Sequence, residues 1–222
     1  MKKISLLVTA IALFFIPYLG KAQNVNWKSF SDSHQQLINL NVGWDYAPSV
    51  GLGYGYRINS KIPVVMNASF SLPLGHNLPD DFKTKLGAQL KVVSIGNFSA
   101  TAKVYGLFTR YQSDYTRLLS FGSEFAAVAG FYKKHWYVAG ECGFDKAIST
   151  QVMNSGKMKE YYPGIQDGWY VPTGGNFFYG IQSGISFKTN DVTLNLGKTI
   201  TQDFKSTPLI PFYFQVGFNR RF

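Results

Sequence analysis

Lysine, arginine and glutamate side chains occur within segments that otherwise alternate between apolar and polar residues. If neighbouring segments pair as hairpins about their turns, Lys103 and Glu141 fall at a similar height two strands apart. Lys91 and Glu124 would lie near them on the same wall, and Arg57 shares that polar face. Charges in a low-dielectric setting are normally paired. The spacing indicates an ion-pair network bracing a narrow interior or a polar constriction that selects solutes, and both point these side chains inward.

Acid–base or metal chemistry would need carboxylates and imidazoles held together in one place. Of the three histidines, only His76, in the stretch GHNLPDD with Asp80 and Asp81, falls in one of the longer loops. A single loop supplies no second, strand-borne acidic pair to hold a reacting water, so we expect a solvated loop. The single cysteine, Cys142, cannot form an intramolecular disulfide or a thiolate metal cluster. We therefore expect no catalytic residue, no metal and no cofactor.

The segment 147–175 is the strongest local indication of function. Connections longer than about 12–15 residues are usually functional or disordered. This one carries four aromatic residues, whose rings are costly to leave scattered in water: Tyr161, Tyr162, Trp169 and Tyr170. We expect them to form a lid or plug over the mouth of the fold, or an exposed recognition patch.

The amino terminus has the layout of a secretory signal peptide at residues 1–22. Two early lysines precede an apolar run from Ile4 to Leu19, and small residues follow it. The run is shorter than the roughly 20 residues that a spanning helix needs, which disfavours a retained membrane anchor. We expect cleavage after Ala22, followed by a periplasmic segment at 23–35.

Composition and periodicity favour an all-β chain. Aromatic residues make up 17% of the 222 residues and charged residues 15%, against about 25% charged residues in typical soluble domains. Ten segments alternate with period two, at lengths that suit tilted strands crossing a bilayer. These are residues 36–46, 49–59, 61–72, 83–94, 98–110, 121–132, 135–146, 177–188, 191–202 and 209–222.

Alternation alone does not say which face of the strands points inward. A soluble lipocalin-like barrel would enclose the apolar face, whereas an outer-membrane barrel turns it toward lipid. Short connections such as NSK, SIGN, YKKH and TND alternate with long ones such as PLGHNLPDD and TQDFKSTP, which favours the membrane barrel. Several Tyr and Trp residues near strand ends could form interfacial girdles: Trp44, Tyr46, Tyr105, Trp136 and Tyr179.

The signal peptide, the alternating strands and the ending FYFQVGFNRRF resemble those of bacterial outer-membrane β-barrel proteins. The resemblance implies a closed antiparallel up-and-down transmembrane β-barrel over 36–222, with about ten strands and with eight or twelve as alternatives. Arg220 departs from the apolar residue usual at its position. The resemblance also implies that the outer-membrane assembly machinery reads the last strand as an insertion signal, through Phe214, Val216, Phe218 and Phe222.

Three classes of function stay open. A non-enzymatic barrel that binds or passes small solutes through a narrow polar lumen is the first. The second is a surface-recognition or envelope-stabilising barrel acting through its extracellular loops, and the third is an omptin-like or lipid-modifying outer-membrane enzyme. The formal net charge of +10 suits the phosphates of lipopolysaccharide in the outer membrane, since no nucleic-acid motif accompanies it.

Overall fold

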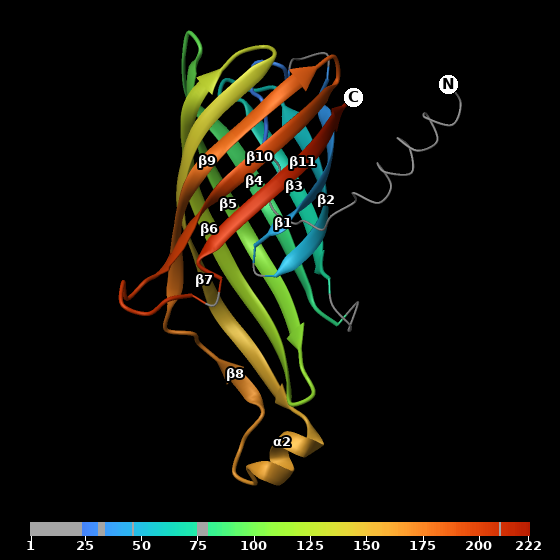
Figure 1. The fold of residues 1–222 in the computed structure, drawn as a ribbon, viewed down its shortest axis with the longest axis vertical. Helices are drawn as coiled ribbons and strands as arrows, with labels where there is room; N and C mark the ends of the chain where they lie inside the picture. The colour runs from blue at the N-terminus through green and yellow to red at the C-terminus, as the bar shows by residue number, and fades with distance from the viewer. Residues whose placement is uncertain (1–23, 31–33, 46, 75–79, 209) are drawn as a thin grey trace, which may run out of the picture.

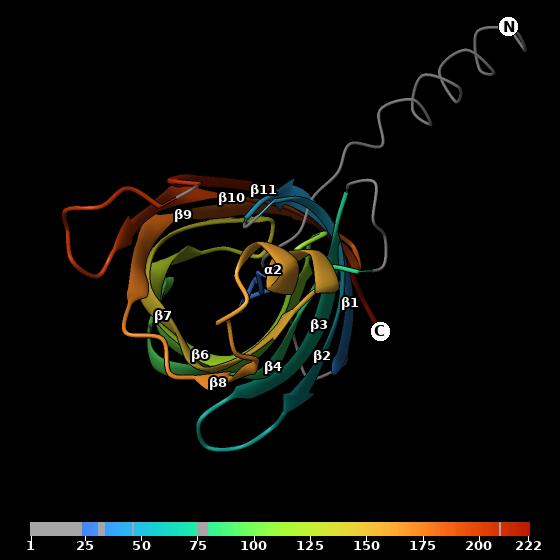
Figure 2. The ribbon, with the colours of Figure 1, turned by 90° about the horizontal axis from the view of Figure 1, so that it is seen from below.

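The computed structural model describes residues 24–30, 34–45, 47–74, 80–208 and 210–222, so the predicted signal peptide and His76 lie outside the described residues. Ten strands of the described chain close into an antiparallel barrel (Figures 1 and 2), which confirms the predicted fold class. They are β1 (Gln36–Trp44), β2 (Pro48–Ile58), β3 (Val64–Pro73), β4 (Phe82–Ile95), β5 (Phe98–Gln112), β6 (Thr116–Tyr132), β7 (Trp136–Asn154), β9 (Gly175–Phe187), β10 (Asn190–Thr201) and β11 (Phe212–Arg221).

The first and last strands close the barrel. β1 and β11 pair in antiparallel register from Leu37 opposite Arg221 to Trp44 opposite Phe214. Pairing continues to the last residue, because the amide of Phe222 donates to the carbonyl of Gln36 at 3.0 Å. In hydrocarbon an unpaired backbone group is costly, so this closure removes the open edge that a sheet would otherwise present.

The two faces of the strands differ in polarity, and the apolar face points outward. Leu52 and Phe125 are 55% and 52% exposed on the outer wall, whereas Asn39 and Gln89, which face the lumen, are 0% and 1% exposed. A soluble barrel would show the reverse pattern. The structure therefore contradicts the lipocalin-like alternative and agrees with a barrel whose outer wall faces lipid.

Aromatic rings form a girdle on the outer wall near one end of the barrel. Neighbouring centroids lie 4.8–6.1 Å apart along the series Phe70, Phe82, Phe108, Phe121 and Trp169. Near the other end Phe98 packs on Phe131 at 5.8 Å. Phe98 and Phe108 are ten positions apart on β5, or about 33 Å along the strand, which a tilt of about 40° reduces to the ~25 Å of an outer-membrane apolar band.

The barrel has a turn end and a loop end. The turn end holds the short connections, the start of β1 and the end of β11. At the loop end, β6 starts earlier and β7 ends later than predicted, so the loop expected at 147–175 begins only after Asn154. Alternation fades there because both faces of this hairpin lie beyond the aromatic girdle and meet water, while the ladder of backbone hydrogen bonds continues.

The remaining loop contains a short helix and a short strand. Helix α2 (Gly156–Tyr161) begins at Ser155, whose side chain accepts a hydrogen bond from the amide of Met158, and β8 (Gly168–Tyr170) pairs with β7. Both project away from the barrel in Figure 1. Among the described residues, no helix has the length and apolar character needed to cross a membrane.

Candidate functional site in the lumen

A buried ion pair lies at the waist of the lumen. The Lys103 Nζ on β5 donates to the Glu141 Oε1 on β7 at 2.7 Å, and both side chains are less than a tenth exposed. Asn195 Nδ2 on β10 donates to the other carboxylate oxygen at 3.4 Å. The structure thus brings together the two residues that the hairpin register placed at similar height.

A second ion pair lies on the same wall. Lys85 on β4 contacts Glu124 on β6, and its ammonium lies 5.7 Å from the ring centroid of Tyr105. Glu124 is therefore bound to Lys85. Lys85 was missed by the sequence analysis, although it shares the inward parity of Gln89 on β4.

Aromatic side chains narrow the lumen beside these ion pairs. Tyr105 is buried in the interior and not in a girdle, so that prediction was wrong; β5 runs on to Gln112, which makes Tyr105 a mid-strand, inward residue. Phe178 and Tyr213 meet edge to face at 6.4 Å. An alanine at Gly197 would put its Cβ 2.4 Å from the Tyr213 ring, so glycine makes room for that ring. The cavity left at the waist is about 40 Å³, enough for a few waters only.

A wider vestibule occupies the loop end. It measures about 360 Å³, and residues at the loop ends of the strands and in the β10–β11 connection line it. Lys83 donates to Asp45 at 3.1 Å on one side, and Asn176 donates to Asp145 at 3.0 Å on the other. The volume is within the range of small-molecule pockets, and the polar lining offers both donors and acceptors.

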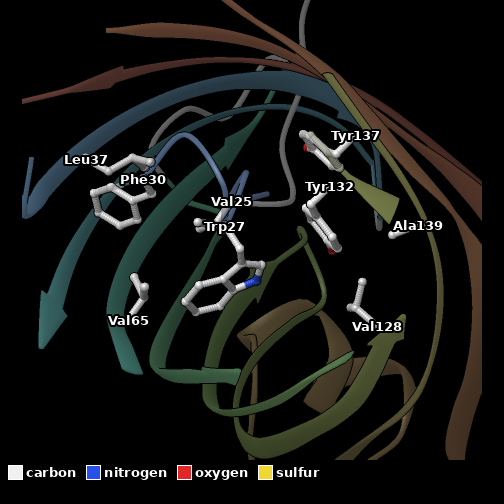
Figure 3. Packing of buried hydrophobic residues seen from close by; sticks show 9 residues of the cluster. All are labelled: Val25, Trp27, Phe30, Leu37, Val65, Val128, Tyr132, Tyr137 and Ala139. Carbon is white, nitrogen blue, oxygen red and sulfur yellow. The ribbon is translucent and has the colours of Figure 1, made fainter. Parts of the chain in front are cut away.

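The turn end of the lumen is filled by residues 24–30, called here the inner segment. Its side chains Val25, Trp27 and Phe30 are buried (Figure 3). They belong to one apolar cluster with residues of the barrel strands: Leu37, Val65, Val128, Tyr132, Tyr137 and Ala139. The predicted periplasmic segment 23–35 thus enters the barrel over residues 24–30.

Polar contacts also hold the inner segment. Arg57 donates to the carbonyl of Phe30, Arg221 to the carbonyl of Ser29, and Asn219 Nδ2 to the carbonyl of Asn24 at 2.7 Å. The ammonium of Lys91 lies 5.7 Å from the Trp27 ring centroid. Arg57 and Lys91, expected beside Lys103 and Glu141, are therefore engaged with the inner segment.

An ion pair that was not predicted from the sequence also lies at this end. Arg221 Nη2 lies 3.1 Å from Asp191 Oδ1, and both side chains are almost fully buried. The same guanidinium donates to the carbonyl of Lys188 at 2.8 Å. The inward parity of Arg221 beside Asn219 on β11 was the available signal.

The aromatic residues of the α2–β8 loop do not fill the mouth of the barrel. Tyr161, Tyr162, Trp169 and Tyr170 are all exposed. Trp169 instead stacks on Phe121 of the outer wall. The prediction that these four rings form a lid or plug was wrong, because the projecting β6–β7 hairpin carries the loop away from the rim.

The proposed insertion-signal residues of β11 lie on the outer wall. Phe214, Val216, Phe218 and Phe222 are all exposed there. Arg220 shares this face, with its guanidinium 5.4 Å from the Phe222 ring centroid.

The described residues contain no cluster of three or more His, Cys, Asp or Glu side chains that could hold a metal. Asp80 contacts Arg110 at 3.4 Å, and Asp81 accepts a hydrogen bond from the amide of Gln112 at 2.6 Å. Both acids thus anchor the β3–β4 connection to β5. Cys142 is exposed on the outer wall.

No protein-family model matches the chain, and no curated protein matches it. Among solved structures it is similar to the KdgM porin at 9% identity and a TM-score of 0.43, and to the "KdgM porin in complex with disordered oligogalacturonate" at 10% and 0.42. Both similarities cover 84% of this chain and 99% of the porin. The closed antiparallel barrel, apolar outside and polar inside, is itself the architecture of outer-membrane β-barrel proteins.

Proposed function

We propose that this protein is a non-enzymatic outer-membrane barrel that admits small polar solutes into its lumen from the loop end. The observation that carries the proposal is the vestibule of about 360 Å³ at the loop end of the lumen, whose lining includes four charged side chains and several polar ones. The apolar outer wall and the predicted signal peptide support an outer-membrane location, with lipid and lipopolysaccharide as its surroundings.

The charges of the vestibule favour uncharged polar solutes. Its lining includes two acids, Asp45 and Asp145, and two lysines, Lys83 and Lys146. Charges of balanced sign attract neither anions nor cations strongly, while their hydrogen-bonding atoms can replace those of water around a solute. A solute can pass beyond the vestibule only if the side chains at the waist and the inner segment move aside.

Liposome swelling and planar-bilayer recordings test this proposal. We expect swelling with small neutral polyols and sugars that falls with solute size, together with small, intermittent currents of weak ion selectivity. Heat-denatured protein reconstituted at the same ratio is the control. Absence of both swelling and current from protein that migrates as a folded barrel would contradict solute passage.

Recognition at the cell surface is a second candidate. The exposed rings of Tyr161 and Tyr162 on the projecting α2–β8 loop favour it, since aromatic residues are enriched in binding surfaces. Replacing both with serine would abolish cell-surface binding if this function holds, and would leave swelling unchanged. Binding that survives the double replacement would exclude this patch.

A further inference from the structure

We infer that the turn end of the lumen is a peptide-binding site, that its ligand is the inner segment of the same chain, and that release of this segment opens the turn end of the lumen. This inference rests on the proposed passage of solutes. It concerns Asn24 to Phe30 at the turn end, and not the aromatic loop that was predicted to act as a plug.

The barrel recognises the main chain of the inner segment. Three side chains of β2 and β11 reach into the lumen and donate to three of its carbonyls: Arg57 to Phe30, Asn219 to Asn24, and Arg221 to Ser29. Donors that converge on the backbone of an extended or turned segment are how proteins hold peptide ligands. Arg221 is itself oriented by Asp191 at 3.1 Å, so the donor is placed before the segment binds.

Side-chain contacts set the position of the segment. Asn26 Nδ2 donates to the carbonyl of Lys133 at 3.0 Å and to Ser186 Oγ at 2.8 Å. Figure 3 shows Trp27 and Phe30 within the lumen among residues of several strands. Tyr132 and Tyr137 stack at 5.3 Å in the same cluster. The side chains of the segment thus bind through the amide of Asn26 and an apolar surface, as a ligand in a pocket does.

The inner segment is also separable from the barrel. It folds on itself, since the amides of Ser29 and Phe30 both donate to the carbonyl of Asn26. Within the described residues it belongs to none of the strand pairings that close the barrel. Its departure would break side-chain contacts at the turn end and leave every described strand ladder intact, so the barrel can persist while its turn end opens.

A disulfide lock tests the inference in the full chain. Ser29 Oγ and Ser186 Oγ lie 3.4 Å apart, so Ser29→Cys with Ser186→Cys, in a Cys142→Ser background, joins the segment to β9 on oxidation. The single variant Ser29→Cys in the same background is the control. We expect oxidation to lower the open probability in planar bilayers by at least about tenfold, as a shifted two-state equilibrium would, and reduction to restore it.

A release variant provides the opposite change. Asn26→Ala with Trp27→Ala removes both the amide contacts and the largest ring of the segment, and we expect longer open times. The synthetic peptide NVNWKSF, added on the turn side, should close this variant again, whereas a scrambled peptide should not. Heat-modifiable migration in electrophoresis checks that every variant forms the barrel.

The outcomes separate the two proposals. Equal currents in the oxidised and reduced forms of the locked variant, with disulfide formation verified by mass spectrometry, would overturn the inner segment as a gate and leave solute passage standing. Currents absent from every folded variant, including the release variant, would overturn solute passage and the gate together.

Discussion

Lys103 on β5 and Glu141 on β7 form a 2.7 Å ion pair inside the lumen, although β6 separates their strands. The inward parity of both residues and the width of a single strand bring them within reach. The pair lines the cavity of about 40 Å³ at the waist of the lumen. It therefore joins β5 to β7 across the lumen and braces the barrel wall.

Breaking this pair on one side should destabilise the barrel. Lys103→Met leaves the buried Glu141 carboxylate without its main partner, and we expect a loss of about 3 kcal/mol in the free energy of unfolding. Urea unfolding in lipid bilayers, followed by tryptophan fluorescence, measures it. The double variant Lys103→Met with Glu141→Leu should recover most of the loss. A double variant as unstable as the single one would contradict an energetically coupled pair.

The outer wall should reject charge. Val104 is 43% exposed on the lipid-facing side of β5, and Val104→Arg should cost about 2–4 kcal/mol of membrane-folding free energy. Thr101 is buried on the opposite face of the same strand, so Thr101→Ser is the matched control and should fold like the parent. Comparable folding of both variants in bilayers would contradict the assignment of faces.

The last residue should matter for assembly. The backbone of Phe222 exchanges two hydrogen bonds with Gln36, at 3.0 and 3.3 Å, and its ring lies on the outer wall. Deleting Phe222 should lower the yield of folded barrel in the outer membrane, measured by heat-modifiable electrophoresis. Phe204→Ala, at an exposed ring of the loop end, should leave the yield unchanged. Equal yields from both variants would argue against Phe222 as an insertion signal.

The β10–β11 loop should loosen in acid. Asp203 accepts hydrogen bonds from the amides of Lys205 and Ser206, and these hold its pKa well below the usual value. Because the pKa of Asp203 is lower in the folded loop, the ionised carboxylate stabilises the loop at pH values above the unfolded pKa of about 3.9. This stabilisation is lost as the pH falls through the folded pKa. Exchange of the Ser206 amide, after correction for intrinsic rates, should therefore be slow from pH 7 to about 4 and become faster as the pH falls further. Asp203→Asn should remove this change in exchange rate with pH. If the change persists in Asp203→Asn, another group causes it.

Sequence alone predicted the barrel because period-two alternation is a local signal. Alternation along each strand places Leu52 outside and Asn39 inside. The register of the hairpins then places Lys103 and Glu141 at a similar height inside the barrel. The same parity places the side chains of Lys85 and Arg221 inside the barrel. These were missed because charged residues near strand ends resemble solvated turns.

The inner segment could not be predicted from local patterns. Residues 24–30 alternate only over 24–27, a run too short to predict an element, and their contacts join distant parts of the chain, as between Asn24 and Asn219. Val25, Trp27 and Phe30 gain burial only after the barrel has closed around them. The extension of β6 and β7 was likewise invisible, because strands outside hydrocarbon have no apolar face to mark them.

The central claim is that a barrel with a lipid-facing outer wall opens a polar vestibule to the cell surface. Thiol labelling on intact cells tests this claim most directly. In a Cys142→Ser background, Thr109→Cys would place a thiol in the vestibule and Val104→Cys one on the lipid-facing wall of the same strand. A small, charged, membrane-impermeant thiol reagent should modify the cysteine at 109 and spare the one at 104. Modification at 104 with protection at 109 would contradict the account.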